Sequence, residues 1–481
     1  MTASLARLVF PSLRWRPTQG GFDHERAKID AALKAGVGGF IIFGGDRAAV
    51  ASLTTNLRRA ARRPLLIGAD LERGPAQQVQ GLTELPPPAA LGALNDLPTT
   101  ATAGVITGTE ARSVGINWAF APVCDLDIEP RNPIVQTRSF GAEPDLVSRH
   151  AAEWIRGCQD HGVLACAKHY PGHGRTTQDS HATLPQVPTS FAELEKTDLA
   201  PFRAAVNGGV GSVMSAFVAY TGWDATGRAA TFSPTIQGYL RDTLGFQGLV
   251  VTDALIMAGA TAREAEGPAT ATAVTAGCDA LLYPENFSSV VAALDIAVGT
   301  FIPTARADAA LARVEEAAAR WSRGPDQGDA DLAAHAAFAD GVADRAVTVA
   351  RGEPARFRAP LAVEIVDDDV GGPYTVGPRD LFHQALRDGG VPVGSGLSGG
   401  ATATRVVLVY AEPRSWKGRA DLGPKSLRAL ERLSNRASLI LLFAHPRLSH
   451  QIPGQAPVVC CWHGQPLMQR AAARWLLRHL A

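Results

Sequence analysis

The feature that most constrains the fold of this chain is the alternation of two kinds of segment between residues 1 and 300. Short runs of consecutive Val, Ile, Leu and Phe are separated by longer amphipathic stretches. Apolar runs of this length are typical of strands that are buried on both faces, as in a parallel sheet. Eight such runs occur, at residues 5–10, 38–43, 65–70, 117–122, 164–170, 211–217, 248–254 and 279–284.

Helical segments lie between most of these runs. Residues 24–36, 47–63 and 191–209 place apolar side chains at helical spacing, and the last two are suited to crossover connections. The sequence therefore predicts an α/β fold, and eight β–α units favour a (β/α)8 TIM barrel. An open doubly wound sheet is the competing interpretation.

The composition and the hydrophobic pattern change beyond residue 323. Turn formers open this stretch, an alanine-rich helix follows, and we interpret residues 326–355 as a linker with a helix. Later apolar runs alternate with amphipathic helices, which is typical of a small α/β sandwich domain. We expect a TIM-barrel catalytic domain at 1–325 and a small α/β domain at 356–481. The later runs are 361–369, 404–413, 437–446 and 456–462, and the helices lie near 378–389, 424–436 and 465–480.

Charge and composition exclude several classes of protein. Lys+Arg and Asp+Glu both number 46, and a general nucleic-acid binder would carry a basic surplus. No apolar run reaches the length of a membrane span, and the start of the chain lacks the features of a signal peptide. The six cysteines include no CxxC pair, so buried reduced thiols are expected. We expect a cytoplasmic protein without a nucleic-acid or membrane partner, and the sequence does not set its oligomeric state.

Charged residues stand at the ends of several apolar runs. Asp70 ends the third run, Lys168 and His169 end the fifth, and Asp253 ends the seventh, while Asp125 follows the fourth. In a (β/α)8 barrel the chemistry is carried by residues at the carboxyl ends of the strands. A charge in a buried strand is costly unless it is paired. The alternative is that these charges only neutralise one another.

The fifth run continues into an unusual loop, KHYPGHGRTTQDSH, at residues 168–181. Asp179 and His181 are two residues apart, so their side chains can meet in a turn. An aspartate beside a histidine orients the ring and favours its protonated form, which gives an acid/base group near neutral pH. Asp253, on another strand, is then available as a carboxylate nucleophile or stabiliser.

Metal and dinucleotide sites are the rival interpretations of these motifs. His169, His173, Asp179 and His181 are all metal-ligand types, but Pro-Gly interrupts the His-x3-His spacing, so we expect no metal. The stretch GSGLSGG at 394–400 fits GxGxxG. A helix precedes it and a strand follows, which is the reverse of the dinucleotide-binding order, so we expect no cofactor.

The loop at 168–181 closely resembles the KH-x-PGHG…DSH signature of family 3 glycoside hydrolases, in the β-N-acetylglucosaminidase (β-hexosaminidase) branch. Further similarity lies at GADLERG (68–74), at TRSFG (137–141) and in the stretch 230–257, which contains VVTDAL. The resemblance covers residues 35–320, and the C-terminal part looks like a shortened second domain of this family.

This resemblance implies a retaining double displacement. Asp253 would form a glycosyl-enzyme intermediate, His181 would be the acid/base, and Asp179 would hold and polarise His181. Most retaining glycosidases use two carboxyl groups, so the His–Asp dyad would be an exception. The family also implies sugar binding by four residues. They are Asp70, Arg138, Lys168 and His169.

The resemblance implies a β-N-acetylglucosaminidase that trims terminal N-acetylglucosamine from glycoconjugates, in particular from recycled cell-wall (peptidoglycan) fragments. This sequence departs from the family pattern at two positions that bear on the substrate: Gln78 stands where an arginine is expected, and Phe217 stands where a histidine is common. The alternatives are a β-glucosidase or other family 3 exo-glycosidase, a phosphorylase that uses phosphate as acceptor, and a non-catalytic sugar-binding protein.

Overall fold

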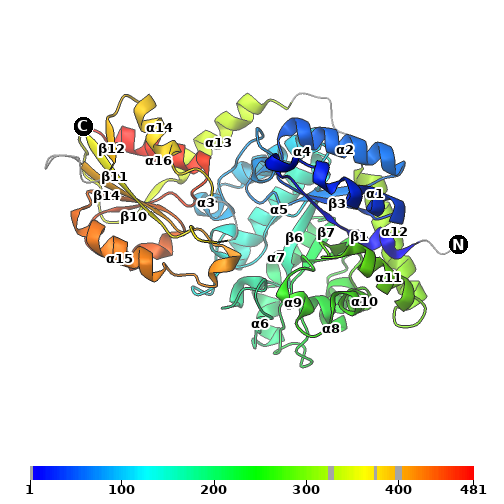
Figure 1. The fold of residues 1–481 in the computed structure, drawn as a ribbon. Coiled ribbons are helices and arrows are strands. Elements are labelled where there is room, and N and C mark those ends of the chain that lie inside the picture. Colours follow the sequence, from blue (N-terminus) through cyan, green and yellow to red (C-terminus); the bar gives the residue numbers. More distant parts are fainter. Residues whose placement is uncertain (1–3, 323–329, 373–375, 396–403) are drawn as a thin grey trace. The chain divides into compact units, whose positions relative to one another are not determined.

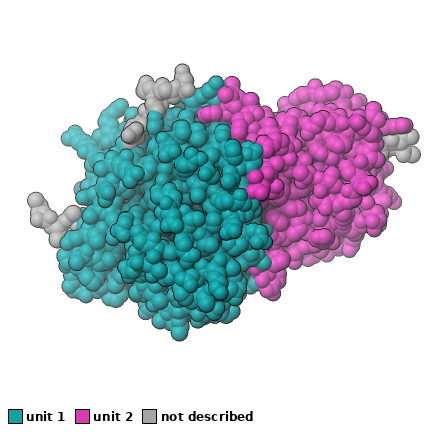
Figure 2. All heavy atoms as spheres, turned by 180° about the vertical axis from the view of Figure 1, so that it is seen from behind, with its two compact units in different colours: residues 1–84, 96–128, 141–332 teal, residues 85–95, 129–140, 333–481 magenta. Residues whose placement is uncertain are grey.

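The computed structural model describes residues 4–322, 330–372, 376–395 and 404–481. The chain divides into two compact units, which are coloured separately in Figure 2. Unit 1 comprises residues 1–84, 96–128 and 141–332, and unit 2 comprises residues 85–95, 129–140 and 333–481. Unit 2 therefore gathers two segments from within the first 140 residues.

Unit 1 is built on a parallel sheet of seven strands in sequential order (Figure 1). The strands are β2 (Ser12–Arg14), β3 (Gly39–Phe43), β4 (Leu66–Ala69), β5 (Trp118–Ala119), β6 (Leu164–Tyr170), β7 (Ser212–Ser215) and β8 (Leu249–Thr252). Parallel pairing continues past this sheet, since Val251 bridges to Ala280, and β9 (Leu281–Leu282) pairs with β1 (Val9–Phe10). Only Pro11 separates β1 from β2.

Helices connect the strands of unit 1, as α/β topology requires for parallel pairs. They include α1 (Arg26–Ala35), α2 (Arg47–Ala61), α4 (Leu97–Ser113), α5 (Pro144–Asp160), α6 (Phe191–Lys196), α7 (Ala200–Asn207), α8 (Pro234–Gly238), α9 (Ala258–Thr261), α10 (Glu266–Ala276), α11 (Phe287–Ala297) and α12 (Thr304–Trp321). The sequence thus predicted a mostly parallel α/β fold correctly, and each of the eight runs contains strand residues.

Aromatic side chains fill the inner face of this curled sheet. The Phe10 and Phe120 rings meet the Trp118 ring edge-on, with centroids 5.4 and 5.0 Å away. The Trp118 indole N–H crosses to β7 and donates to Ser212 Oγ at 2.9 Å. A Cβ atom on Gly68 would lie 2.5 Å from the Phe120 ring, so only glycine fits there. Gly68, Trp118 and Ser212 therefore mark the inward-facing side of their strands.

Two predicted elements of unit 1 differ from the structure. Residues Leu5–Leu8 form a 3-10 helix, and the strand of the first run begins only at Val9. The helix predicted over 191–209 is two helices, because Pro201 lies in the first turn of α7. Proline fits the first turn of a helix but would remove a hydrogen bond from the interior of a longer one.

Unit 2 contains a six-stranded sheet with the order β10-β15-β14-β13-β11-β12, in which only the β10–β15 pairing is antiparallel. Figure 1 shows α15 on one face of the sheet and α14 with α16 on the other. The strands are β10 (Thr348–Arg351), β11 (Leu361–Asp367), β12 (Val393–Ser395), β13 (Thr404–Tyr410), β14 (Leu439–Phe443) and β15 (Val458–Cys460). The helices include α3 (Pro88–Leu94), α13 (Leu332–Ala346), α14 (Leu381–Asp388), α15 (Pro424–Leu433) and α16 (Pro466–Arg478).

The predicted linker at 326–355 holds α13 and β10, which belong to unit 2 from Ala333 onward. Residues 323–329 and most of the GxGxxG stretch lie outside the described residues. No helix among the described residues is long and apolar enough to cross a membrane. All six cysteines are buried and none forms a disulfide.

Candidate active site

Strand register brings three of the predicted site residues to one face of unit 1. Ser212 pairs with Cys166 on β6 and with Leu249 on β8, and Gly68 pairs with Trp118. Side chains two residues apart on a strand share a face. Asp70, Lys168 and Asp253 are therefore inward-facing, each at or just past the carboxyl end of its strand.

Lys168 joins two carboxylates across the sheet. Its ammonium lies 2.7 Å from Asp70 Oδ1 and 2.8 Å from Glu72 Oε1. The Lys168 side chain is 3% exposed, whereas that of Asp70 is 32% exposed and keeps surface for a ligand. Glu72 was not among the predicted site residues. Its signal is the spacing Asp-Leu-Glu, which puts two carboxylates on one side of an extended chain.

The buried carboxylate of Asp125 organises the start of the long loop. Its Oδ2 accepts the Nδ1–H of His169 at 2.6 Å, and its Oδ1 accepts the backbone N–H groups of His169 at 3.1 Å and His173 at 2.7 Å. Burial alone would raise the pKa of Asp125, but the charge and hydrogen bond of His169 lower it to about 2. Asp125 thus stays ionised and fixes the His169 ring.

His173 holds the loop together from within. Its Nε2 lies 2.9 Å from Ser180 Oγ and its Nδ1 lies 2.8 Å from Thr176 Oγ1. Burial lowers the pKa of His173 to about 4, so the ring is neutral near pH 7. One side chain therefore links the beginning of the loop to the residue next to Asp179.

Close backbone packing explains the Gly-His-Gly sequence. A Cβ atom on Gly174 would lie 2.0 Å from the Leu126 carbonyl oxygen, and Gly172 has a φ of +134°. Arg175 then anchors the loop to a buried carboxylate, with Nε 2.8 Å from Asp198 Oδ2. The loop follows a fixed path until it reaches the dyad.

Asp179 and His181 form the predicted pair. His181 Nδ1 lies 2.7 Å from Asp179 Oδ1, which also accepts the backbone N–H of His181 at 2.9 Å. Burial raises the pKa of Asp179, but its hydrogen bond with His181 lowers that pKa by more, so the net shift is downward. The aspartate side chain is 1% exposed and the histidine side chain 43% exposed. The imidazole alone meets solvent, while its carboxylate partner is buried.

The dyad segment is tied to the segment that follows Asp253. The backbone N–H of Ala258 donates to the His181 carbonyl at 3.3 Å, and that of Gly259 donates to the Ser180 carbonyl at 3.1 Å. Asp253 itself accepts the Ala254 N–H at 2.7 Å through Oδ1. These two backbone hydrogen bonds therefore connect the segment that carries the acid/base candidate, His181, to the segment that follows the nucleophile candidate, Asp253.

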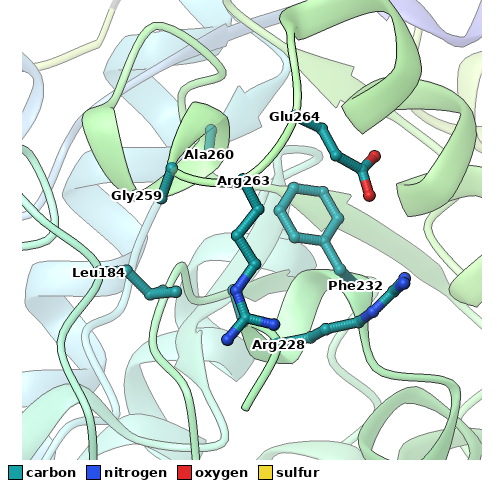
Figure 3. Close-up of a pocket in the computed structure, with 9 residues that line it drawn as sticks. Leu184, Arg228, Phe232, Gly259, Ala260, Arg263 and Glu264 are labelled. Carbon is teal, nitrogen blue, oxygen red and sulfur yellow. The ribbon is translucent and has the colours of Figure 1, made fainter. Parts of the chain in front are cut away.

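A pocket opens beside these two hydrogen-bonded segments, and Figure 3 shows its lining side chains. Leu184 comes shortly after the loop at 168–181, Gly259 and Ala260 from α9, and Arg263 from the segment after α9. The remaining lining residues are Arg228, Ala229, Phe232, Ala262 and Glu264. The pocket therefore brings two arginines near the candidate acid/base loop.

The contacts of Arg138, and of Gln78 and Phe217, which depart from the family pattern, are as follows. Arg138 lies in the 3-10 turn Gln136–Arg138 of unit 2, where its Nη1 donates to the Ile134 carbonyl at 3.2 Å. Gln78 accepts the Gly44 N–H at 3.1 Å through Oε1, and Phe217 is fully buried against Phe232. The sugar-binding role of Arg138 stays a prediction. Among the described residues, no group of three or more metal-ligand side chains could hold a metal ion.

Comparison with known proteins gives consistent matches. Residues 6–317 match the family model for the glycosyl hydrolase family 3 N-terminal domain. A β-N-acetylglucosaminidase/β-glucosidase of Cellulomonas fimi is 33% identical over 385 residues, which cover 76% of this chain and 66% of that protein. A β-hexosaminidase of Thiobacillus denitrificans is 36% identical over 288 residues, which cover 57% of this chain and 79% of that protein.

A solved structure is similar over the full length of the chain. It is a glycoside hydrolase family 3 β-N-acetylglucosaminidase from a Paenibacillus species, with 27% sequence identity and a TM-score of 0.87. The match covers 100% of this chain and 97% of that one.

Proposed function

The chain belongs to glycoside hydrolase family 3, and we propose that it is a retaining β-N-acetylglucosaminidase that removes terminal β-linked N-acetylglucosamine from glycoconjugates. One observation carries this proposal. The imidazole of His181 is partly exposed and is held by the buried carboxylate of Asp179. The backbone of His181 is hydrogen-bonded to the segment that follows Asp253.

In the first step Asp253 attacks the anomeric carbon, and the bond to the leaving-group oxygen breaks as His181 protonates that oxygen. Asp179 accepts Nδ1–H, so the transferred proton is carried on Nε2. Asp179 also stabilises the imidazolium, and general-acid catalysis of this kind contributes about 10²–10⁴-fold. The product of this step is a glycosyl ester on Asp253.

In the second step neutral His181 takes a proton from water, and the water oxygen attacks the anomeric carbon. The bond to Asp253 breaks, and the configuration of the sugar is retained because two inversions have occurred. Asp70, Lys168 and His169 hold the hydroxyl groups of the sugar, and a sugar-binding role for Arg138 is proposed from the family resemblance alone. The partly exposed carboxylate of Asp70 and the fixed ring of His169 support these roles.

We also propose that unit 1 is a complete (β/α)8 barrel, and that residues 326–355, which carry α13 and β10, lead from it into a small α/β sandwich domain. The parallel bridge from Val251 to Ala280 and the pairing of β9 with β1 support closure. In this barrel, β1 and β2 are one strand interrupted at Pro11.

We further propose that cell-wall (peptidoglycan) fragments in the cytoplasm supply the natural substrate. This rests on the similarity to the family branch.

The first test is hydrolysis of p-nitrophenyl β-N-acetylglucosaminide beside the matching β-glucoside. Wild-type protein should prefer the N-acetyl sugar, Asp253→Ala should abolish activity, and His181→Ala should reduce it strongly. Activity on the glucoside alone would indicate a β-glucosidase. Full activity of His181→Ala would place the acid/base elsewhere, and no activity on either sugar would favour a binding protein.

The exposed imidazole also favours phosphorolysis as a second candidate function. A neutral imidazole does not repel phosphate as a carboxylate would, and the dyad's carboxylate is buried. A phosphate oxygen would attack the anomeric carbon of the ester, forming a sugar 1-phosphate and releasing the Asp253 carboxylate. Adding phosphate to the assay should then raise the turnover rate and yield sugar 1-phosphate. Unchanged rates and products would exclude this function.

A further inference from the structure

A groove on the outer side of unit 1 lies between the helices that follow β6 and β7. Its walls come from α6, from the loop after β7, and from α8 with the π-helical turn Tyr239–Thr243 that continues it (Figure 1, lower centre). The groove has a volume of about 500 Å³, in the range of sites that bind small organic ligands. Three aromatic side chains line it, those of Phe191, Trp223 and Tyr239, and we refer to it as the aromatic groove.

The three rings of the aromatic groove pack on one another. The centre of the Phe191 ring lies 4.9 Å from that of Trp223 and 5.2 Å from that of Tyr239. The Trp223 and Tyr239 centres are 5.3 Å apart. Rings at this spacing are in contact, so they leave no room for a cation between them. All three residues are nevertheless only partly buried. The rings therefore form a platform on which a flat ligand can lie, and not a cage that encloses one.

Hydrogen bonds hold this platform in place. The Tyr239 hydroxyl donates to Glu195 Oε1 at 2.9 Å and accepts from Arg203 Nη2 at 3.3 Å. The Leu244 N–H donates to the Tyr239 carbonyl at 3.0 Å, which closes the π-helical turn. Turns of this kind are frequent at functional sites. A ligand would meet rings that are already ordered, which lowers the entropic cost of binding.

Polar groups along the groove are available to a ligand. Within the described parts of the chain, four of them have no hydrogen-bonding partner: the Trp223 indole N–H, the Asp242 carboxylate, and the hydroxyls of Thr235 and Thr243. The charged side chains of the lining are the carboxylates of Glu195 and Asp242, which disfavour an anionic ligand such as a nucleotide. A pyranose ring fits these features, because it has an apolar face and carries hydroxyl groups at its edge.

The aromatic groove is separate from the candidate catalytic groups. Ile236 and Leu240 lie on the same helical turns as Tyr239 but are fully buried. The hydroxyl of the buried Tyr170, at the end of β6, donates to the Ile236 carbonyl at 2.9 Å. These buried side chains lie between the strand and the groove, and no residue of the groove ends a strand. The groove is therefore not part of the site that holds the terminal sugar.

We propose that the aromatic groove is a second carbohydrate-binding site, which holds a β-linked N-acetylglucosamine oligosaccharide on the outer side of unit 1. The apolar face of a sugar ring lies on the Trp223 platform, and the Asp242 carboxylate accepts hydrogen bonds from its hydroxyls. The indole N–H donates to an acetamido carbonyl. Binding here keeps a long glycan at the enzyme and raises its local concentration. The choice of sugar rests on the proposed glycosidase function, whereas the groove itself requires none of the catalytic groups.

The test counts binding sites by isothermal titration calorimetry with the β-1,4-linked tetrasaccharide of N-acetylglucosamine. Asp253→Ala serves as the parent protein, so that the ligand is not cleaved during the titration. The parent should bind two molecules per chain. Adding Trp223→Ala should leave one site, because loss of a central tryptophan weakens binding at the groove about tenfold or more.

Two further variants separate binding from support of the fold. Asp242→Ala removes an exposed carboxylate that has no partner, so it should weaken the groove site about 3- to 10-fold without lowering the Tm. It keeps the test decisive if Trp223→Ala does not fold. Phe301→Ala is the matched control, because it removes a 55% exposed ring after α11 and should leave both sites unchanged.

Each contrary result has a defined meaning. Site number and affinity that both Trp223→Ala and Asp242→Ala leave unchanged would overturn the proposal. An equal loss in Phe301→Ala would also overturn it, since any exposed ring would then act alike. Hydrolysis of p-nitrophenyl β-N-acetylglucosaminide by wild type, with one site that Trp223→Ala does not affect, would reject only the groove. A wild-type protein that cleaves no sugar but binds the tetrasaccharide at a site that Trp223→Ala removes would reject the glycosidase function and keep the groove.

Discussion

At the scale of single residues, the site depends on carboxylates that are buried behind the groups they support. Asp125 holds His169, Asp179 holds His181, and Glu72 pairs with Lys168. The sequence predicted Lys168 and His169 from their place at the end of a strand, and His181 from its spacing to Asp179. It did not pair Asp125 with His169 or Glu72 with Lys168, because those pairs join separate strands and depend on their register. Asp179 and His181 were predictable as a pair because they are only two residues apart.

The Asp179–His181 hydrogen bond gives a prediction about leaving groups. Asp179→Asn should keep the loop shape but hold the imidazole less well and stabilise its protonated form less. We expect kcat/KM to fall about 10²-fold or more for an alkyl β-N-acetylglucosaminide, and less for the p-nitrophenyl sugar, whose leaving group needs little protonation. Steady-state kinetics on both substrates would measure this difference.

A double variant provides the control for that prediction. If Asp179 acts only through His181, the Asp179→Asn, His181→Ala double variant should be no slower than His181→Ala alone. Additive losses would instead mean that Asp179 acts on the reaction by a separate route.

The neutral ring of His173 predicts how stability depends on pH. Its pKa is about 4 when folded, below the value of about 6.5 expected in the unfolded chain. The unfolded chain therefore takes up a proton first, so the contribution is complete above pH 6.5 and is lost as the pH falls to 4. The loss amounts to about 3 kcal/mol. Urea unfolding between pH 7 and pH 4 should show a shallower decline for His173→Asn than for wild type, and parallel curves would contradict the assignment.

At the scale of elements, long apolar runs were predictable and short edge strands were not. β6 and β11 have seven residues each and match their predicted runs closely. β10 was missed because its residues are only partly buried and form no apolar run, and β12 has three residues including a glycine. Periodicity reports burial on both faces, so it does not detect strands at the edge of a sheet.

The long loop of the site is also an element, and its glycines predict its sensitivity. Gly174→Ala would place a methyl group 2.0 Å from the backbone oxygen of Leu126, which cannot move as a flexible side chain would. We expect a loss of about 1–3 kcal/mol in the free energy of unfolding and a marked loss of kcat, because the path to Asp179 and His181 shifts. Urea unfolding and the p-nitrophenyl assay would measure both effects.

Gly341→Ala is the matched control for that substitution. Gly341 lies within α13, and nothing stands within 4 Å of an added Cβ atom. This change should stabilise the protein by about 0.5–1 kcal/mol, because alanine is the better helix former, and it should leave kcat unchanged. Wild-type stability and activity in Gly174→Ala would show that the loop adapts to the methyl group.

At the scale of the whole molecule, the two units do not follow the order of the chain. Unit 2 includes residues 85–95 and 129–140, which the sequence assigned to the first domain. Gln465, just before α16, donates through Nε2 to the Leu85 carbonyl at 2.7 Å. Changes in composition and hydrophobic pattern along a sequence locate boundaries between consecutive segments. They carry no signal for short segments that pack with a distant part of the chain.

This arrangement predicts that a fragment of residues 1–332 is not an independent domain. Without residues 333–481, the segments 85–95 and 129–140 lose the rest of their compact unit, so their backbone loses packing and hydrogen bonds. The fragment should unfold at a lower temperature than the full chain, and trypsin should cleave at Arg138 much faster. Thermal unfolding by circular dichroism and limited proteolysis with mass spectrometry would test this, with the full chain as control. An equal Tm and no new cleavage at Arg138 would show that both segments fold with unit 1, and that the boundary predicted from the sequence describes the folding unit better.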